Sequence, residues 1–433
     1  MPRPYISRLD EKASRRLLEE CFRREAGSSV PIPSDEVDLI ETGVLDSMSW
    51  VSFLRALETA TGASDLGSIL NERSPSFAAL LMTLDESSSA SAVAERSDLP
   101  RGHVRSPAHA VIVASSSTVG SRVLPSEDVD RAFGMPAGKL RSRAGIESLA
   151  YVAEGENELT LAATAAQEAL RAASCGAQEL DWIVATSETH HDYPSLSAQL
   201  HSRLLARENC AALDVGGACL GLLNALAVAQ SLVGSGQAKT ILIVTADVHT
   251  RTLTPGRVAG EFGGLFGDGA SAFLLRGANT AGSSDAYLLG EFIFGCAGQY
   301  AAAIQISDSK DGSLRVQFDG EALSRAAITR MEKVISAVEL RSGISRTTVG
   351  GFATHQPNPR LVALLAKQCG VSPSAFPPVA KVSGNLGSST CGAALHEALR
   401  NASKQAGHDR RPIFLASLGP GLLFGGGWLA PQD

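Results

Sequence analysis

The spacing of apolar residues changes once along the chain and divides it into two parts. Up to residue 84 the apolar positions follow the period of amphipathic helices. Helices are predicted over 10–25, within GVLDSMSWVSFLRALETATG and over 76–84, with apolar stripes made by Leu17, Leu18 and Phe22 and then by Met48, Val51, Leu54 and Leu57. We therefore expect residues 1–84 to form a small all-α helical bundle.

From residue 108 to 433, apolar runs typical of strands alternate with helical segments of ten or more residues. The strand-like runs are HAVIVASSS, DWIVATS, CAALDVG, TILIVTAD, SAFLLRG, YLLGEFIF, GGFATH and PIFLASLG, and helices are predicted over 196–205, 220–233, 321–342, 359–369 and 390–402. This alternation predicts a layered α/β fold. Two similar passes, over 108–280 and 281–433, indicate a duplicated fold. Residues 85–107 are rich in Ser and lack a period, so we interpret them as a flexible linker.

Composition narrows the function only slightly. The 433 residues suffice for two or three packed units, and 44% hydrophobic with 19% charged residues is ordinary for a soluble globular protein. A net charge of −7 gives no overall attraction to nucleic acid or anionic membrane, so neither is an expected partner. The chain shows no secretory signal and no run of about 18 apolar residues, so we expect it in the cytoplasm.

Cysteine and histidine spacing argues against a metal site. The seven cysteines show no CxxC or Cys/His ligand pattern, which also disfavours a disulfide framework. His190, His191 and His249 have no neighbours at ligand spacing, so we interpret them as structural and expect no metal.

Cys219 is the candidate nucleophile. In DVGGACLGLLNALAVAQ a strand ends in Gly216-Gly217, and the cysteine stands where the next helix begins. Unpaired N–H groups at a helix start stabilise a thiolate, so this position predicts a lowered pKa for the thiol. The alternative interpretation is a buried core cysteine. Core or surface roles explain five of the others, which lack this setting: Cys175, Cys210, Cys296, Cys369 and Cys391.

His355 and Asn385 complete a Cys/His/Asn set. His355 lies in GGFATHQPNPRL between a strand and a helix that begins at Pro359, and Asn385 lies between glycines in KVSGNLGSST. Taken singly, His355 reads as a loop histidine and Asn385 as a turn residue. Together with Cys219, each member stands at a strand–helix junction, which favours one shared pocket.

Residues 108–430, about three quarters of the chain, resemble the β-ketoacyl-acyl-carrier-protein synthase III family of the thiolase superfamily. Six motifs in the family's order carry the resemblance: ATSETHHDYPSLSAQLHSRL, DVGGACLGLLNAL, FGGLFGDGASAFLL, HQPNPRL, SGNLGSST and SLGPGLLFGGGW. It implies a five-layered αβαβα fold, usually homodimeric, whose substrates are acyl thioesters on a carrier protein or coenzyme A.

The resemblance also implies the role of each site residue. Cys219 takes the acyl group, and His355 and Asn385 hold the carbonyl oxygen of a malonyl-type extender while it loses carbon dioxide, because two neutral donors stabilise the resulting enolate. The backbone N–H groups of Cys219 and of a glycine near Gly421 form the oxyanion hole. Tyr193 reaches across the dimer toward the acyl pocket.

The chain departs from the family at three places. Leu149 stands near the position of an early arginine, and Leu220 replaces the small residue frequent after the cysteine, which changes the acyl-chain fit. GKLRSRAGI lacks the aromatic residue that stacks coenzyme A, although Arg257 is a candidate for the basic half of that contact.

The first 84 residues resemble an acyl or peptidyl carrier protein. In GVLDSMSWVSFLRAL, Ser47 stands at the start of a helix, where a carrier bears 4′-phosphopantetheine attached by a phosphopantetheinyl transferase. Asp35, Glu36, Asp38, Glu41 and Asp46 suit a surface read by basic partners. The alternative makes Ser47 a helix N-cap and nothing more.

Three functions follow. The first is decarboxylative Claisen condensation in fatty-acid or polyketide-type biosynthesis. The second is transfer of the acyl group from Cys219 to an alcohol or amine without decarboxylation, and family members that only transfer often lack the asparagine found here at Asn385. The third is a non-catalytic partner that docks a carrier, and the intact Cys/His/Asn set argues against it.

Overall fold

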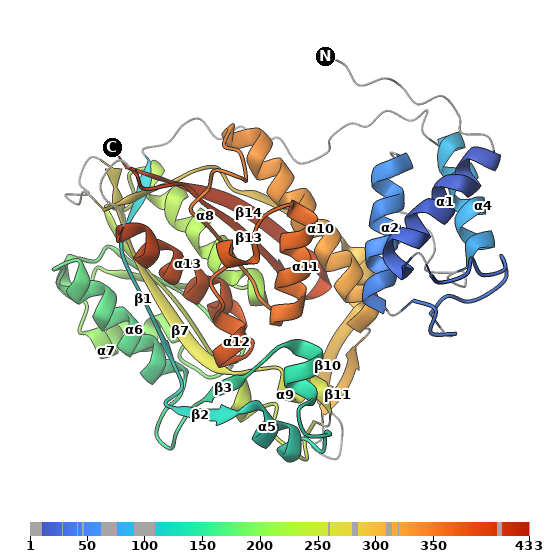
Figure 1. Ribbon diagram of the computed structural model, residues 1–433. Helices are drawn as coiled ribbons and strands as arrows, with labels where there is room; N and C mark the ends of the chain where they lie inside the picture. Colours follow the sequence, from blue (N-terminus) through green and yellow to red (C-terminus); the bar gives the residue numbers. More distant parts are fainter. Residues whose placement is uncertain are drawn as a thin grey trace. The chain divides into compact units, whose positions relative to one another are not determined.

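The computed structural model describes residues 11–27, 29–40, 42–45, 47–61, 76–90, 109–258, 260–278, 285–308, 314–318, 320–404 and 409–432. The chain divides into two compact units, residues 1–98 and residues 99–433 (Figure 1). Most of the predicted linker, residues 91–107, lies outside the described residues, as do Glu41 and Asp46.

The described helices of the first unit are α1 (Glu11–Ala26), α2 (Ser47–Thr61) and α4 (Phe77–Ala90). Trp50, Phe53 and Leu57 of α2 are almost fully buried and pack against Phe22 and Phe77. Phe22 meets Phe53 and Phe77 edge to face, with ring centroids 6.0 and 5.4 Å apart. Leu54 and Leu57 of the predicted stripe are buried in this core, and the aromatic side chains of Trp50 and Phe53 join them. The side chains of Met48 and Val51 lie outside the described part of the structure.

Two further features of this unit differ from expectation. Helix α4 continues to Ala90, so the first six residues of the predicted linker are helical. Asp35, assigned to an acidic docking surface, accepts two hydrogen bonds of 2.7 Å from the guanidinium of Arg15 on α1. Its charge is therefore engaged within the unit.

A ten-stranded sheet crosses the second unit in the order β12-β13-β14-β8-β1-β7-β6-β4-β5, with β9 paired to β14. Its strands are β1 (Ala110–Val119), β4 (Trp182–Thr186), β5 (Ala211–Asp214), β6 (Thr240–Val248), β7 (Asp268–Gly277), β8 (Tyr287–Leu289), β9 (Ile293–Cys296), β12 (Gly351–Thr354), β13 (Ile413–Gly419) and β14 (Leu423–Pro431). Parallel pairs lie at the two ends of the sheet, β4 with β5 and β6 at one end and β12 with β13 at the other. Strand β5 precedes Cys219 and β12 precedes His355.

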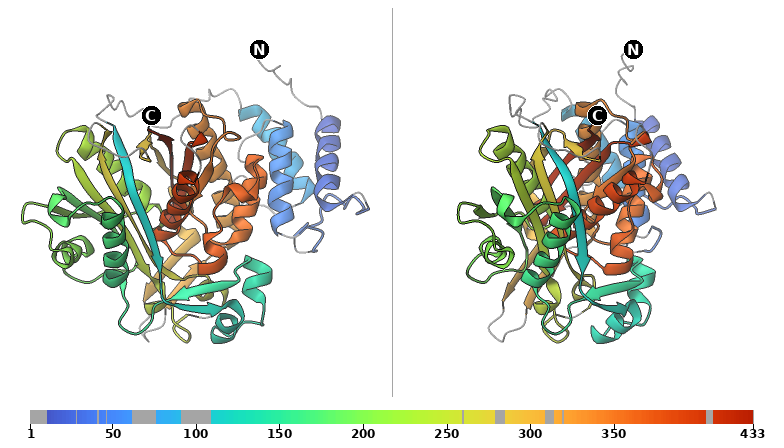
Figure 2. Two further views of the ribbon diagram at one scale, coloured as in Figure 1. Left: turned by 60° about the vertical axis from the view of Figure 1, so that its left-hand side comes forward. Right: turned by 90° about the vertical axis from the view of Figure 1, so that its left-hand side faces the viewer.

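Helices complete five layers around this sheet. Figures 1 and 2 show α8 (Gly221–Gly234) and α13 (Ser388–Ser403) between its two halves. The outer layers are α6 (Glu158–Ala172) with α7 (Leu196–Leu204) on one side and α10 (Gly320–Ser342) with α11 (Pro359–Cys369) on the other. One core cluster joins α8 and α13 to both halves, and a second lies under α6 and α7. The predicted duplicated αβαβα fold is confirmed.

Smaller elements complete the described part of the second unit. They are β2 (Arg122–Pro125), β3 (Ser148–Tyr151), β10 (Ile304–Asp308), β11 (Leu314–Phe318), α5 (Ser126–Ala132), α9 (Glu261–Gly264), α12 (Val379–Ser383) and several short 3-10 turns. The run YLLGEFIF, expected as one strand, forms β8 and β9. Within the described residues, none of the helices combines the length and apolarity needed to cross a bilayer.

Candidate active site

Cys219 lies in a tight turn between β5 and α8. Gly217 has φ of 130°, and a Cβ on it would stand 2.3 Å from Nδ2 of Asn224, so glycine is required there. Ala218 has φ of 48°, an uncommon backbone conformation for alanine directly before the candidate nucleophile. Asn224 donates to the carbonyl of Gly216 at 2.9 Å and fixes the turn to the first turn of α8.

The end of β13 packs against this turn. Ser417 donates to the carbonyl oxygen of Cys219 at 2.7 Å, and a Cβ on Gly419 would stand 2.8 Å from the carbonyl oxygen of Gly217. Pro420 follows and has no N–H to offer. The carbonyl of Gly421 accepts from the Cys296 thiol at 3.7 Å. Gly419 is thus packed closely against the turn that carries Cys219. The role of the Gly421 N–H in an oxyanion hole stays a prediction.

His355 and Asn385 are both buried, with exposed fractions of 7% and 5%. Burial lowers the pKa of His355 to about 4, so its imidazole is neutral at physiological pH, and its Nδ1 has no hydrogen-bond partner. The side-chain oxygen of Asn385 accepts from the Gly387 N–H at 3.0 Å and from Thr390 Oγ1 at 3.1 Å. This fixes the amide so that its NH2 group is the part left for donation.

The thiol of Cys219 contradicts the predicted lowering of its pKa. The side chain is 8% exposed, and burial is the largest cause that raises its pKa well above the ordinary value. The charge of Glu188 beside the thiol raises the pKa further, and Asp247 adds to the effect. The start of a helix favours a thiolate, but desolvation next to two carboxylates outweighs that contribution.

Glu188, Asp247 and His249 form a buried charged cluster beside Cys219. The Glu188 N–H donates to Asp247 Oδ1 at 2.6 Å, and Glu188 Oε2 lies 3.7 Å from His249 Nε2. Burial lowers the pKa of His249, but the neighbouring carboxylates outweigh it and raise that pKa to about 9. His249 is therefore a cation, and its ring stacks on Phe266 with centroids 4.6 Å apart.

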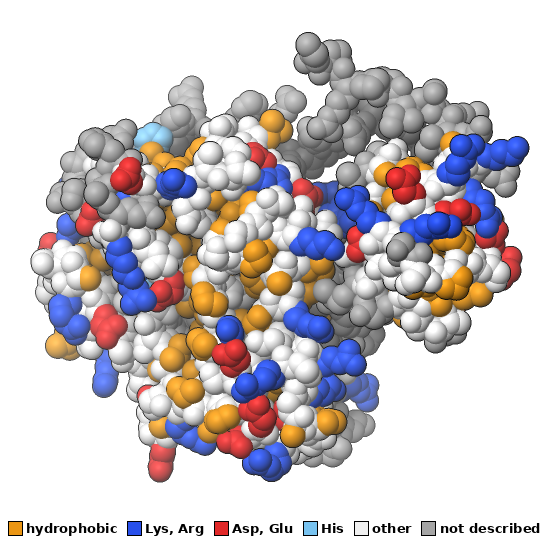
Figure 3. All heavy atoms as spheres, in the orientation of Figure 1, with side chains coloured by type: hydrophobic (Ala, Val, Ile, Leu, Met, Phe, Trp, Pro, Cys, Tyr) orange, Lys and Arg blue, Asp and Glu red, His pale blue; other side chains and the backbone are white. Residues whose placement is uncertain are grey.

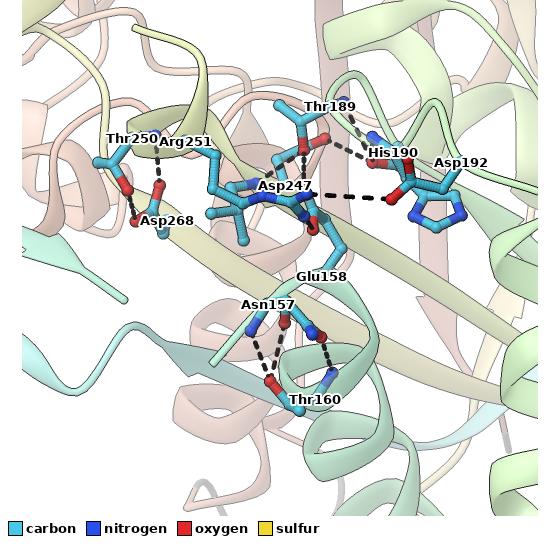
Figure 4. A network of polar contacts seen from close by, with 12 residues as sticks. Asn157, Glu158, Thr160, Thr189, His190, Asp192, Asp247, Thr250, Arg251 and Asp268 are labelled. Atoms are coloured by element: carbon cyan, nitrogen blue, oxygen red, sulfur yellow. Dashed lines mark hydrogen bonds and ion pairs between the residues drawn. The ribbon is translucent and has the colours of Figure 1, made fainter. Parts of the chain in front are cut away.

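A polar network holds the loop that carries Glu188 (Figure 4). Arg251 forms an ion pair with the buried Glu158 and lies 3.9 Å from Asp192. Thr189 donates to Glu158 at 2.9 Å and accepts from the Val248 N–H at 2.8 Å. Because Thr189 directly follows Glu188 and is hydrogen-bonded to the Val248 N–H, these contacts hold the start of the Glu188 loop beside β6.

Gly387 lies against all three members of the cluster. It has φ of 59°, and a Cβ there would stand 2.6 Å from His249 Cε1, 2.8 Å from Asp247 Oδ2 and 2.9 Å from Glu188 Oε1. The loop of Asn385 and the charged cluster therefore meet at a residue that has no room for a side chain.

We expect Gly387→Ala to destabilise the second unit by roughly 1–3 kcal/mol, because the backbone conformation is strained for alanine and three fixed groups must move. Thermal unfolding measures the effect. Gly370→Ala is the matched control, since Gly370 has φ of 66° and open space around it. Equal losses of stability in the two variants would contradict the crowding around Gly387.

The remaining predicted residues lie farther from this cluster or at the surface. Leu220 is 3% exposed and packs in the central core. The side chain of Tyr193 is 98% exposed, so within one chain it does not line the buried site. Arg257 donates to the Thr252 carbonyl at 3.4 Å. Leu149 is buried against Gly384, next to Asn385.

Sequence reasoning missed Glu188 and Asp247, and it treated His249 as merely structural. Glu188 stands within the ATSETHHDYP motif, and the other two end the run TILIVTAD or follow it. Charged residues at the ends of neighbouring parallel strands were the available signal. Within the described residues, no group of three His, Cys, Asp or Glu side chains has the geometry to hold a metal ion.

Comparisons with known proteins agree with this architecture. Residues 213–289 match the family described as 3-oxoacyl-[acyl-carrier-protein] synthase III, and residues 340–430 match its C-terminal domain. The β-ketoacyl-[acyl-carrier-protein] synthase III of Haemophilus ducreyi is 29% identical over 320 residues, which cover 73% of this chain and 98% of that protein.

Solved structures give the same result. The 3-oxoacyl-(acyl carrier protein) synthase III of Pseudomonas aeruginosa is 26% identical with a TM-score of 0.66, covering 75% of this chain and 99% of that one. The enzyme of Aquifex aeolicus is 25% identical with the same TM-score, covering 74% and 99%. These likenesses support a member of the 3-oxoacyl-[acyl-carrier-protein] synthase III family of the thiolase superfamily, and with it a condensing enzyme, a transferase in the broad sense.

Proposed function

We propose that the second unit is acylated on Cys219 by an acyl thioester and then performs a decarboxylative Claisen condensation. The observation that carries the proposal is the state of the two donors. His355 is neutral and buried with an unpartnered ring nitrogen, and Asn385 has its oxygen engaged so that its NH2 group donates. Two fixed neutral donors suit the enolate oxygen that decarboxylation produces. Release of carbon dioxide from a malonyl thioester by the acylated protein tests it.

A second candidate is acyl transfer from Cys219 to an alcohol or amine. One observation favours it: the buried carboxylate of Glu188 lies beside the thiol and could accept a proton from a hydroxyl. The two functions share the acylation step and differ afterwards. Product analysis with a malonyl thioester and with a hydroxyl acceptor, each offered to the acylated protein, distinguishes a new carbon–carbon bond from an ester.

We further propose that the first unit is a carrier domain bearing 4′-phosphopantetheine on Ser47. In support, α2 begins at Ser47, directly after the GVLD segment of the motif, in a compact unit of short helices. The side chain of Ser47 lies outside the described part of the structure. A carrier joined to its own ketosynthase raises the local concentration of the thioester toward millimolar.

Incubation with a phosphopantetheinyl transferase and coenzyme A tests this proposal. We expect wild type to gain the mass of the arm and Ser47→Ala to remain unchanged, while Ser49→Ala, two residues along the same helix, gains the arm like wild type. No mass gain in any of the three proteins would contradict a working carrier, and gain in Ser47→Ala would place the arm elsewhere.

The surface of the second unit suits an acidic carrier. Figure 3 shows Lys and Arg side chains, with acidic ones among them, around α5 and α9. Arg143 and Arg360 are exposed near that region, and Arg360 donates to the Arg143 carbonyl at 3.3 Å. Arg131 and Arg141 are exposed too, but they form ion pairs with Asp128 and Glu127. Because carrier substrates are anionic, this surface favours acyl thioesters on carrier proteins as partners, alongside coenzyme A.

We also propose that the second unit forms a homodimer. Strand β5 lies at the end of the sheet, and Ala212, Leu213 and Asp214 are exposed on it. Tyr193, 98% exposed, precedes the helix next to this strand. An unpaired edge strand beside an exposed aromatic residue suits pairing with a second copy. Sedimentation velocity at micromolar concentration measures the association state.

A further inference from the structure

Glu188 is a buried carboxylate at the site whose role the Cys/His/Asn set does not explain. Its side chain is 15% exposed, and its Oε1 is fully buried without a hydrogen-bond partner. Burying an unpaired carboxylate costs free energy, so an ionised Glu188 beside the thiol requires a nearby positive charge or hydrogen-bond donor.

His249 supplies that compensation. Burial raises the pKa of Glu188, but its hydrogen bond and charge pairing with His249 outweigh burial and bring that pKa below the ordinary value. The His249 ring has an acceptor at each nitrogen, Glu188 on one side and the Gly267 carbonyl at 3.3 Å on the other. A ring placed between two acceptors is held as the cation, which keeps Glu188 ionised at neutral pH.

The other charged group beside the thiol has no oxygen to spare. Asp247 Oδ1 accepts from the Glu188 N–H and from Ser187 Oγ, and Oδ2 accepts from the N–H and Oγ of Ser388. His355 faces Glu188 and is neutral with a pKa of about 4, which makes it a weak proton acceptor. Of the described groups that face Cys219, Glu188 is the one with an ionised, unpartnered acceptor oxygen.

We infer that Glu188 is a catalytic residue that accepts the Cys219 proton during acylation and that His249 is the positioning residue that keeps it ionised. The sulfur forms a bond to the acyl carbon of the incoming thioester while its proton moves to Glu188. The carbon–sulfur bond of the donor then breaks, and the proton passes from Glu188 to the leaving thiolate. Atoms and charge balance without any further reactant.

This inference rests on the proposed acylation of Cys219 and explains how a thiol of raised pKa reacts. A thiol that ionises only well above neutral pH has little thiolate available, so acylation requires a proton acceptor beside the sulfur. The step precedes the choice of acceptor, so it holds for condensation and for simple acyl transfer alike.

The test follows the rate of Cys219 acylation by straight-chain acyl thioesters of N-acetylcysteamine, measured by intact mass from pH 6 to 9. Wild type is expected to give a nearly flat profile, because Glu188 stays ionised across that range. Glu188→Gln should slow acylation about 100-fold at pH 7, the scale of one general base, with a rate that rises with pH as bulk ionisation of the thiol replaces the lost acceptor. Glu188→Asp, which keeps the carboxylate, should restore the flat profile.

Controls separate proton transfer from loss of a buried charge. Asp130→Asn removes another buried carboxylate, on α5, that lies outside the charge set acting on Cys219 and outside the network around Glu188, and it should keep the flat wild-type profile. His249→Gln keeps the base but removes its cation, so the rate should fall toward the acidic end of the range. The His249 variant also tests the inference if Glu188→Gln does not fold.

Two outcomes are decisive. If wild type is acylated on Cys219 and both Glu188→Gln and His249→Gln match its rate and pH profile, Glu188 is not the proton acceptor. If wild type itself is not acylated on Cys219 by any of these thioesters, the proposed function fails, independently of Glu188.

Discussion

Replacing Cys219 with alanine is expected to abolish acyl loading and all turnover. The sulfur is the atom that forms the thioester, and no other group of the site substitutes for it. Exposure of wild type and Cys219→Ala to an acyl thioester, followed by intact mass measurement, should show one acyl group on the second unit of wild type and none on that of the variant.

Cys296→Ala is the matched control, because Cys296 is the exposed free thiol among the described residues. It should load and turn over like wild type. Acyl mass that disappears in Cys296→Ala and persists in Cys219→Ala would mean that labelling reports surface reactivity, and the assignment of Cys219 would be wrong.

Replacing His355 or Asn385 with alanine is expected to separate the two half-reactions. Each variant should still load an acyl group on Cys219, but decarboxylative condensation should fall by about 100-fold or more, the loss usual for one donor to a developing oxyanion. The measurements are acyl loading by mass and carbon dioxide release from a malonyl thioester.

The control for these variants is Asn401→Ala, an exposed position near the end of α13 that should leave both half-reactions unchanged. Normal condensation in Asn385→Ala would contradict its role at the enolate and favour simple acyl transfer. Loss of acyl loading in His355→Ala would assign that residue to the first half-reaction as well.

Residues that start or end helices allowed much of the fold to be predicted from the sequence, because they stand at the ends of the helices in the structure. Helix α11 covers Pro359–Cys369, the predicted range, since Asn358 caps its start, proline occupies its first position and Gly370 ends it in a left-handed conformation. The strand YLLGEFIF divides at Gly290, where a Cβ would meet Trp428 at 2.1 Å. That contact is between residues distant in sequence, so no local pattern announces it.

The candidate site also contains residues that a local motif marks and residues that only the fold brings together. Cys219 and His355 follow strands β5 and β12, as predicted, whereas the strand predicted before Asn385 is wrong, because helix α12 precedes it. Each of the three is nevertheless marked by its motif, so a linear pattern indicates it. The cluster of Glu188, Asp247 and His249 exists only because β4 and β6 are parallel neighbours that end at the same edge. The raised pKa of the Cys219 thiol depends on that cluster and on burial. A prediction made from the helix start alone therefore had the wrong sign.

Peptide mapping after acyl loading tests the central claim most directly. Wild-type protein is incubated with an acyl thioester, digested and sequenced by tandem mass spectrometry without reduction at alkaline pH, which preserves thioesters. The account predicts the acyl group on Cys219, in the peptide that contains DVGGACLGLLNAL, and its disappearance on addition of a malonyl thioester. An acyl group on any other residue of the second unit, or one that a malonyl thioester does not discharge while a hydroxyl acceptor does, would contradict a condensing enzyme acylated on Cys219.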